Sequence, residues 1–445
     1  MMFPRILIVF LFVLVCIQIS IVYIFFTSNN NRSTAHTDRS NQKIRGNNQQ
    51  TNHTQASCPP LIHQQSNNDN NDIRIAFFIR GTKTASALIR LLDTLYLPQH
   101  YYLVHLDVNT PRNQHLKLHT HLQQQYPTAT NIFTFAHPYA VHYMSFDLLF
   151  LDVRAVLFFL HLAGHTAHTN DPLDAKKITF DYFINLSAQE YPLVGLNQLN
   201  QLLLHYKGTN FVEIWCSYED APKYKQNRID EQWFHGKRVR VEGTTVTSDK
   251  PANVHFHYGS FYVVLTKQFL VSLFFDSTML NVLTYLRYTR VPDESFFATA
   301  IMNSKEYKCT HFNSNLRYVN WGRATAFDPV KCVGTTQQTE RIYGAKYLKG
   351  GSHPCILGML DVEFILQNRK LRTERGELER KKGTVAPPWF VFGNKFDVRV
   401  DALSVQRMQR QNLHSWKKIA WDELVLAQRT VPNRLHCPIY NGKGS

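Results

Sequence analysis

The sequence lacks the short motifs that mark several large enzyme classes. Neither glycine-rich phosphate-binding loop, Gly-x-Gly-x-x-Gly or Gly-x-x-x-x-Gly-Lys-Ser/Thr, occurs in the chain, which argues against dinucleotide-dependent and P-loop enzymes. The Gly-x-Ser-x-Gly turn is also missing, which disfavours an α/β-hydrolase. No two cysteines are spaced Cys-x-x-Cys, so we do not expect a zinc ribbon or a redox motif of that kind.

What the chain does have is length and positive charge. Its 445 residues, 44% of them hydrophobic, suffice for one large or two ordinary domains with a sizeable core. The formal net charge is +16 with histidine counted as neutral. This balance indicates an acidic partner, such as nucleic acid, an anionic membrane, phosphate or an acidic glycan, although a solvated basic surface would give the same balance.

A long apolar run lies near the amino terminus. Residues 6–26 carry no charge, and as a helix they would span about 30 Å, the thickness of a hydrocarbon core. No small-residue cleavage pattern follows the run. We therefore predict a cytoplasmic tail at residues 1–5, an uncleaved transmembrane signal anchor at residues 6–26, a flexible polar stem at residues 27–72 and a folded domain at residues 73–445.

Sequons and cysteines predict that the part of the chain after the anchor is lumenal. Asn31 and Asn52 begin glycosylation acceptor motifs in the stem. Six cysteines follow the anchor, an even number that suits a disulfide-forming compartment. The two pairings that we predict are Cys332 with Cys355 and Cys58 with Cys437. A lumenal domain does not meet nucleic acid, which removes that class of partner.

The folded domain begins with a strand–helix–strand pattern. Residues 73–79 read as a buried strand, residues 84–97 as a helix with one apolar face, and residues 101–107 as a second strand. This order predicts a parallel crossover unit and an α/β fold. Further elements are a helix at 145–162 and strands at 180–187, 259–265 and 316–321, the last of them at a sheet edge. In open α/β sheets ligands bind beyond the carboxyl ends of the strands, which places Asp107 and Ser187 at a nucleotide crevice.

Glu294 stands between a proline and a pair of aromatics, in Val291-Pro292-Asp293-Glu294-Ser295-Phe296-Phe297. Desolvation against apolar surface raises the pKa of a carboxyl group toward the range where it accepts a proton near neutral pH. The same residues also make a good helix start, because proline suits the first position and acids complement the helix dipole. Taken alone, the segment favours the helix start.

Three histidines have the spacing of a metal cluster. His161, His165 and His168 precede Asp171, but the glutamate of the zincin motif is missing and Gly164 falls where a helix would end. A metal-dependent hydrolase built on these residues is therefore a distant alternative.

A lysine stands among aromatics near the carboxyl terminus, in Trp389-Phe390-Val391-Phe392-Gly393-Asn394-Lys395-Phe396-Asp397. An unpaired ammonium group buried there would be costly. Lys395 therefore needs an anion, which is either Asp397 or a phosphate group of a ligand.

Eight segments together resemble one family. They are Ile75 to Phe78, Leu95 to Pro98, Val104 to Asp107, Phe183 to Leu193, Gly259 to Phe261, Pro292 to Glu294, Leu316 to Trp321 and Phe392 to Asp397. Their order is similar to that of the core-2/I-branching β-1,6-N-acetylglucosaminyltransferase and xylosyltransferase family, glycosyltransferase family 14. Each motif is loose, and the order makes the set specific.

The resemblance implies a type II Golgi membrane protein with a GT-A-like fold, whose residues 73–445 form the lumenal catalytic domain. It implies inverting transfer of a sugar from a UDP-sugar to a glycan or glycoprotein hydroxyl, with no cofactor and no metal. Asp107-Val108-Asn109 stands where most GT-A enzymes carry the Asp-x-Asp motif that holds a metal, and the missing second acid agrees with metal-free transfer.

The resemblance also assigns roles to residues. Glu294 matches the catalytic base, Asp107 the acid that contacts the nucleotide, and Lys395 the lysine that neutralises the diphosphate. Ser187 is expected beside the nucleotide. Residues expected near the acceptor are Trp321, Tyr258 and Asp293, with other acceptor contacts between Cys216 and Val254.

One departure from the family leaves the donor open. Ser352 stands where the branching enzymes carry a diphosphate-binding arginine, and Lys349 or His353 could replace it. N-acetylglucosamine is the first expectation for the donor sugar, with xylose and glucuronate as alternatives. A lumenal glycan-binding protein that has lost catalysis is the rival of a different class. A homodimer is left open.

Overall fold

The computed structural model describes residues 72–165, 178–320, 354–359, 361–362, 365, 391–396 and 404–408. All of them belong to the compact unit Cys58–Ser445. The anchor predicted at residues 6–26, the stem with Asn31 and Asn52, and Cys58, Cys332 and Cys437 lie outside the described residues. Among the described helices, none is by itself long and apolar enough to cross a membrane, and one pair bent by 82°, Lys267–Phe275 with Ser277–Leu286, passes by length and composition only.

The predicted crossover unit is confirmed. Strand β1 (Ile75–Gly81) is followed by helix α2 (Ala85–Leu95) and strand β2 (Tyr101–Leu106), and β1 pairs with β2 in parallel. Helix α2 buries the leucines that its 3.6-residue period places on one face, Leu88, Leu91, Leu92 and Leu95. The helix ends before Pro98, since the residues ahead of a proline avoid helical backbone angles.

Within the described residues, seven strands form the main sheet, in the order β12-β6-β11-β4-β1-β2-β3. The strands not yet given are β3 (Ile132–Thr134), β4 (Tyr182–Ser187), β6 (Asn210–Ser217), β11 (His257–Thr266) and β12 (His311–Phe312). Pairing is parallel except on the two sides of β11, which runs against its neighbours β4 and β6. The described sheet is therefore mixed and mostly parallel, as predicted.

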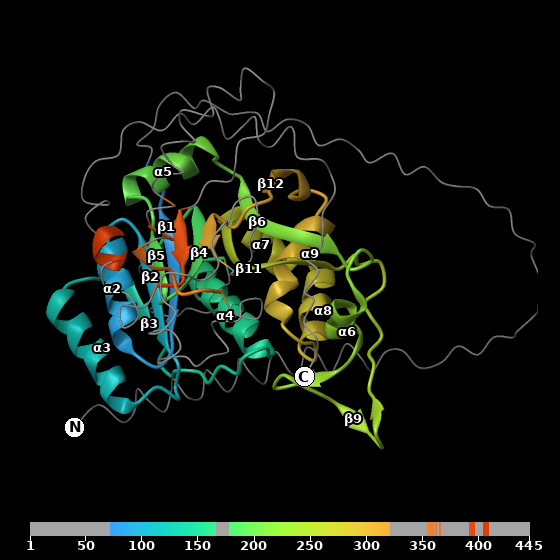
Figure 1. Ribbon diagram of the computed structural model, residues 1–445. Coiled ribbons are helices and arrows are strands. Elements are labelled where there is room, and N and C mark those ends of the chain that lie inside the picture. The colour runs from blue at the N-terminus through green and yellow to red at the C-terminus, as the bar shows by residue number, and fades with distance from the viewer. Residues whose placement is uncertain are drawn as a thin grey trace, which may run out of the picture. The chain divides into compact units, whose positions relative to one another are not determined.

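Helices cover both faces of the sheet (Figure 1). Side chains alternate along a strand, so β1 sends Ile75, Phe77 and Ile79 to one face and Ala76 and Phe78 to the other. The first face packs against α2, α3 (Arg112–Gln125) and α5 (Leu196–His205). The second packs against α4 (Phe146–Leu162), α7 (Lys267–Phe275), α8 (Ser277–Leu286) and α9 (Phe296–Asn303).

A second, three-stranded sheet lies beyond the end of β4. Its order is β13 (Arg317–Val319), β14 (Phe392–Asn394) and β5 (Glu190–Pro192). The strand predicted at residues 316–321 is thus β13, and it stands at an edge of this sheet within the described residues. The sheet joins segments far apart in sequence and brings the residues after β14 next to the end of β4.

The segment between β6 and β11 carries small elements rather than an open loop. Helix α6 (Lys223–Asp230) is followed by one hairpin of β7 (Trp233–Phe234) and β8 (Lys237–Arg238), and by another of β9 (Arg240–Val241) and β10 (Thr244–Thr245). The hairpin of β9 extends away from the sheet at the lower right of Figure 1.

Gly259 permits β6 and α9 to approach β11 closely. A Cβ atom at this position would lie 2.4 Å from the carbonyl oxygen of Glu213 and 3.0 Å from the Cβ of Ala298. The register between β6 and β11 shifts on both sides of Gly259, which is the expected effect of a bulge. Strand β6 and helix α9 are therefore held closer to β11 than another residue would allow.

Three of the cysteines lie in described segments, and Cys216, Cys309 and Cys355 are each disulfide-bonded. Cys216 and Cys355 are fully buried. The pairing of Cys332 with Cys355 and that of Cys58 with Cys437 stay predictions, because three of these four residues are outside the described part of the chain.

Candidate active site

The carboxyl ends of the central strands form one edge of the site. Arg80 near the end of β1 stands opposite His105 of β2 on one side and opposite Ser187 of β4 on the other. The amide of Asp107, just after β2, donates to the carbonyl of Gly81 at 3.0 Å. Asp107 and Ser187 therefore flank the same strand at the same sheet edge, as predicted.

The carboxylate of Asp107 is buried and holds a loop. Its Oδ1 accepts from the amide of Asn109 at 2.8 Å, and its Oδ2 accepts from the amide of Val141 at 2.9 Å. The amide of Val108 donates in turn to Tyr139. Asp107 thus fixes the segment before α4 against the strand ends, and its contact with a nucleotide stays a prediction.

Lys395 reaches the same edge from the far end of the chain. It follows β14, whose Asn394 pairs with Glu190, and the amide of Phe396 donates to Gln189 at 2.7 Å. Ser187 is close by, because its amide donates to Oε2 of Glu190 at 2.6 Å. The structure therefore brings together Lys395 and the turn after β4, which lie about two hundred residues apart in sequence.

Glu294 ends a short 3-10 helix, η2 (Pro292–Glu294). Its Oε2 accepts a hydrogen bond from Nη1 of Arg228 at 2.9 Å, and 28% of its side chain is exposed. Val291, which precedes η2, has a left-handed backbone with φ of 55°, a strained conformation for a β-branched residue that is found most often at functional sites. Glu294 is thus both oriented and accessible.

Asp293 does not cap the helix that follows it. Helix α9 begins after Ser295, and no side chain makes a capping hydrogen bond there. The polypeptide instead makes the separate turn η2, with Pro292 at its first position, so the acids never reach the first turn of α9. The predicted proline helix start is confirmed, but for η2 rather than for α9.

Asp293 is instead a buried carboxyl group. Its Oδ1 has no hydrogen-bond partner among the described residues. Burial, with a smaller contribution from the Glu294 carboxylate, raises the pKa of Asp293 to about 8, although Arg80 opposes the shift. Asp293 is therefore protonated at neutral pH, and its predicted contact with an acceptor stays a prediction.

Two buried ion pairs lie beneath the strand ends. Nη1 of Arg80 is 2.7 Å from Oδ1 of Asp152 on α4, and the guanidinium stacks 3.6 Å from the ring centroid of Phe261. Nε of Arg317 is 3.1 Å from Oε1 of Glu190. Burial raises the pKa of Asp152 to about 6, although Arg80 and an amide hydrogen bond favour its ionised form. Buried pairs of this kind fix geometry, since loss of one partner leaves an uncompensated charge.

Helix α6 brings two cations to Glu294. Lys225 and Arg228 are three residues apart and share one face of the helix. Lys225 is buried, with its Nζ 4.8 Å from the ring of Trp215. Burial lowers the pKa of Lys225 to about 8, while Glu294 favours its charged form. The hydroxyl of Tyr258 donates to the carbonyl of Lys225 at 2.8 Å, so this buried tyrosine supports α6, and its own contact with an acceptor stays a prediction.

Other predicted residues fall outside the described part of the chain. They are Trp321, Lys349, His353, His168 and Asp171. The metal-ligand grouping found among the described residues does not include His161 or His165.

Sequence reasoning missed the cations Arg80, Lys225, Arg228 and Arg317. A signal existed for Arg80, the charged residue within the apolar strand Ile75-Ala76-Phe77-Phe78-Ile79-Arg80-Gly81. The spacing Lys225-x-x-Arg228 was a signal too, since it puts two cations on one helix face. Neither pattern identifies a partner, because the partner is distant in sequence.

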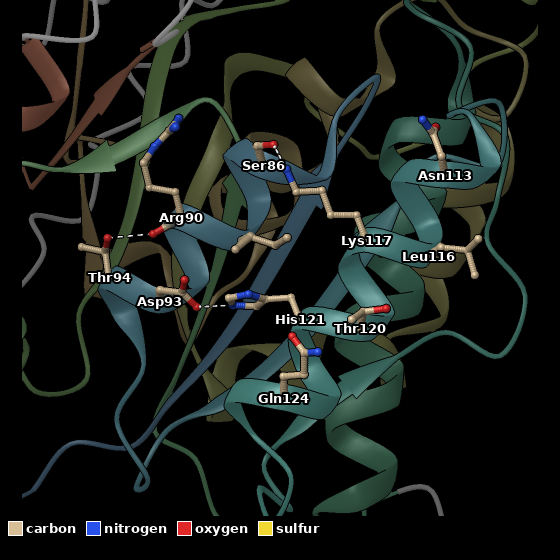
Figure 2. Close-up of a pocket in the computed structure, with 11 residues that line it drawn as sticks. Ser86, Arg90, Asp93, Thr94, Asn113, Leu116, Lys117, Thr120, His121 and Gln124 are labelled. Atoms are coloured by element: carbon tan, nitrogen blue, oxygen red, sulfur yellow. Dashed lines mark hydrogen bonds and ion pairs between the residues drawn. The ribbon is translucent and has the colours of Figure 1, made fainter.

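A separate pocket lies between α2 and α3 (Figure 2). It has a volume of about 650 Å³, and its walls carry the ion pair of Asp93 with His121 at 2.8 Å and a hydrogen bond from Lys117 to Ser86 at 2.8 Å. None of the residues described around Asp107, Lys395 and Glu294 lines this pocket, so it is distinct from the candidate active site.

Comparison with known proteins finds a family model that matches part of the chain. Residues 171–350 match the model of the Core-2/I-Branching enzymes. The chain carries a Core-2/I-Branching enzyme domain. This confirms the resemblance seen in the motifs, and the matched segment contains Glu190, Arg228, Glu294 and Arg317.

Three relatives of this chain are named for the transfer of different sugars. Beta-glucuronosyltransferase GlcAT14C of Arabidopsis thaliana is 26% identical over 254 residues, which cover 56% of this chain and 62% of the relative. Beta-1,3-galactosyl-O-glycosyl-glycoprotein beta-1,6-N-acetylglucosaminyltransferase 4 of Danio rerio is 22% identical over 314 residues, covering 66% and 68%. Xylosyltransferase 1 of Rattus norvegicus is 27% identical over 265 residues, covering 57% and 28%. The chain thus spans only part of the length of these proteins.

Proposed function

We propose that the protein is an inverting glycosyltransferase that moves a sugar from a UDP-sugar to a hydroxyl group of a glycan or glycoprotein. The observation that carries the proposal is the placement of Glu294, accessible and held by Arg228 at 2.9 Å, within a Core-2/I-Branching enzyme domain. The mixed, mostly parallel sheet supports assignment of the domain to the GT-A-like fold.

Glu294 would act as the general base. The acceptor oxygen forms a bond to the anomeric carbon while the bond from that carbon to the β-phosphate oxygen breaks. The acceptor proton passes to Glu294, and the electron pair of the broken bond leaves on UDP. One carboxylate suffices, because UDP needs charge stabilisation rather than a proton donor. Arg228 would hold the carboxylate toward the acceptor, as a charge-assisted hydrogen bond restricts its rotamer.

Lys395 would neutralise the charge that develops on the diphosphate. It stands beside the turn after β4, at the sheet edge shared by Asp107 and Ser187. A lysine can take the place of a metal as a point charge, and loss of a preorganised electrostatic group of this type typically costs about 2.7–4 kcal/mol of barrier. Lys349 or His353 is the second cation in this proposal, and no metal takes part in the transfer.

N-acetylglucosamine in β-1,6 linkage stays our first candidate for the transferred sugar, with glucuronate and xylose beside it. All three occur in the names of relatives of similar identity, so the donor must be measured. We further propose a single-pass type II protein of the Golgi membrane, anchored through residues 6–26 with its catalytic domain in the lumen.

A donor screen tests the proposal. The purified full-length chain is incubated with UDP-N-acetylglucosamine, UDP-glucuronate and UDP-xylose and with a panel of glycan and glycopeptide acceptors, and UDP release and product mass are measured. Turnover of one donor is expected, with a product of inverted anomeric configuration. UDP binding without turnover of any donor would favour the glycan-binding alternative. Lys395→Ala should weaken UDP binding, and an unchanged UDP affinity would remove Lys395 from the diphosphate site.

A further inference from the structure

Two histidines and an aspartate from two segments far apart in sequence meet near the active site. His142 lies in the segment before α4, Asp147 lies in the first turn of α4, and His235 lies in the turn between β7 and β8. One potential ligand atom from each residue is within 4.8 Å of the other two. These three residues, the His142–Asp147–His235 cluster, have no role in the transfer proposed above.

The side chains of the cluster already face one another. Nδ1 of His142 is 2.7 Å from Oδ2 of Asp147, and the amide of His142 donates to the same oxygen at 3.0 Å. The rings of His142 and His235 are perpendicular, with centroids 4.0 Å apart. The side chain of His142 is 49% exposed and that of Asp147 is 32% exposed, so solvent and a small ion can reach them.

Backbone packing holds the two segments in place. A Cβ atom on Gly236, next to His235, would lie 3.3 Å from the carbonyl oxygen of Tyr143, so the hairpin turn rests directly on the segment that carries His142. The hydroxyl of Ser145 donates to the carbonyl of His142 at 2.8 Å and accepts from the amide of Asp147. The cluster is therefore built by fixed backbone and not by three independent surface side chains.

We propose that the His142–Asp147–His235 cluster binds a zinc ion. Two imidazole nitrogens and one carboxylate are a common three-ligand set for zinc, with water completing a tetrahedron. Bonds of about 2.0–2.1 Å place neighbouring ligand atoms about 3.3 Å apart on such an ion. The cluster spans 2.7 Å to at most 4.8 Å between ligand atoms, so small rotations of exposed side chains complete the geometry.

The ion would stabilise the segment from Val141 to Met144, which forms one wall of the active site. The segment that carries His142 contacts the donor side through the hydrogen bond from Val141 to Asp107 at 2.9 Å. It contacts the base side through the hydrogen bond from Val291 to Met144 at 3.1 Å. Zinc would join this segment to the β7–β8 hairpin. A zinc ion here departs from the expectation of a protein without metal, but in this proposal it takes no part in the transfer itself.

Zinc binding can be measured without any sugar donor. The full-length chain, purified without a polyhistidine tag and stripped with a chelator, is titrated with zinc against a chromophoric indicator, and its melting temperature is followed. Wild type and the exposed control His119→Ala should bind one more equivalent of zinc than His235→Ala or His142→Ala. Zinc should raise the melting temperature of the first two proteins more than that of the last two.

Equal zinc stoichiometry and equal melting shifts in all four proteins would overturn the proposal. If a histidine variant does not fold, Asp147→Asn replaces it, because asparagine keeps the shape but lacks the anionic ligand. That variant should bind zinc more weakly than wild type, and an unchanged affinity would equally overturn the proposal. Zinc binding itself does not depend on the proposed function. Only the inference that the ion supports the active site rests on it. Failure of sugar transfer and failure of zinc binding are therefore separate results.

Discussion

Nη1 of Arg228 lies 2.9 Å from Oε2 of Glu294, although 66 residues separate them in sequence. Arg228 comes from α6, inside the segment from Cys216 to Val254 where acceptor contacts were expected. The amide of Arg290 donates to the carbonyl of Arg228 at 2.9 Å, which ties α6 to the chain leading into η2. The arginine and the proposed base are therefore positioned by one connected piece of backbone.

The first prediction concerns the base. Glu294→Gln should abolish sugar transfer while UDP affinity stays nearly unchanged, because the amide keeps the shape but cannot accept the acceptor proton. UDP binding is measured by calorimetry and transfer by UDP release. The exposed control Glu306→Gln should behave as wild type. Normal transfer by Glu294→Gln would remove Glu294 from the role of base.

The second prediction concerns Arg228. Its hydrogen bond to a charged partner is worth about 1.5–3 kcal/mol, so Arg228→Ala should lower kcat/KM about 10- to 100-fold. Arg228→Lys should recover part of this loss, since it restores the charge without the fork geometry. The control is Arg287→Ala, an exposed arginine just after α8 for which no contact with Glu294 is found among the described residues. If Arg228→Ala and Arg287→Ala have the same kcat/KM, the ion pair does not position the base.

The third prediction uses the buried carboxyl of Asp293. The pKa of this group is raised from 3.8 to about 8 in the folded protein, so between these values the folded state binds a proton that the unfolded state has lost. The contribution of Asp293 to stability is therefore largest in acid and is lost as pH rises from about 4 toward about 8. Asp293→Asn removes this dependence.

The pH dependence of stability that Asp293 contributes is measured by urea unfolding at pH 5 and at pH 8. Wild type should lose more stability than Asp293→Asn over this interval, and the exposed control Asp249→Asn should follow wild type. Parallel losses in wild type and Asp293→Asn would mean that the carboxyl is ionised in the folded protein.

The fourth prediction concerns packing at Gly259. A Cβ atom there would meet the backbone carbonyl of Glu213 at 2.4 Å, and backbone cannot move aside as a side chain does. Gly259→Ala should therefore destabilise the fold by about 1–3 kcal/mol, the usual range for overpacking. Gly81→Ala is the comparison, because its Cβ would meet side-chain atoms at 3.3 Å or more. A melting temperature for Gly259→Ala equal to that of Gly81→Ala would contradict this account.

The sequence predicts helices and strands well where the spacing of apolar residues within the segment determines the structure. The leucine face of α2 and the apolar run of β1 each contain the information for their own structure, and their order implies the parallel pairing that is observed. The same holds for Asp107 and Ser187, since both follow directly from strand ends. Periodicity and strand order need no distant partner.

The charged contacts of the site were not predictable in this way. Arg80 and Asp152 are 72 residues apart, and Arg317 and Glu190 are 127 residues apart. Nothing in the local sequence around either member identifies the other. Asp293 and Glu294 are another example. They are adjacent residues of η2, yet the carboxyl group of Asp293 is buried and that of Glu294 is accessible. The local pattern predicted the segment that carries the site, but tertiary packing determines which of its two carboxyl groups is accessible.

The last prediction separates the two possible roles of a metal. Transfer without a metal at the diphosphate predicts that EDTA does not abolish activity, since Lys395 supplies the fixed charge. If zinc at the His142–Asp147–His235 cluster orders the wall of the site, EDTA should lower wild-type activity only in part, and His235→Ala should show no further loss with EDTA. Initial rates of both proteins are measured with and without EDTA, and again after zinc or magnesium is restored. Complete loss in both proteins, with recovery by magnesium, would place a metal on the diphosphate and contradict the charge assigned to Lys395.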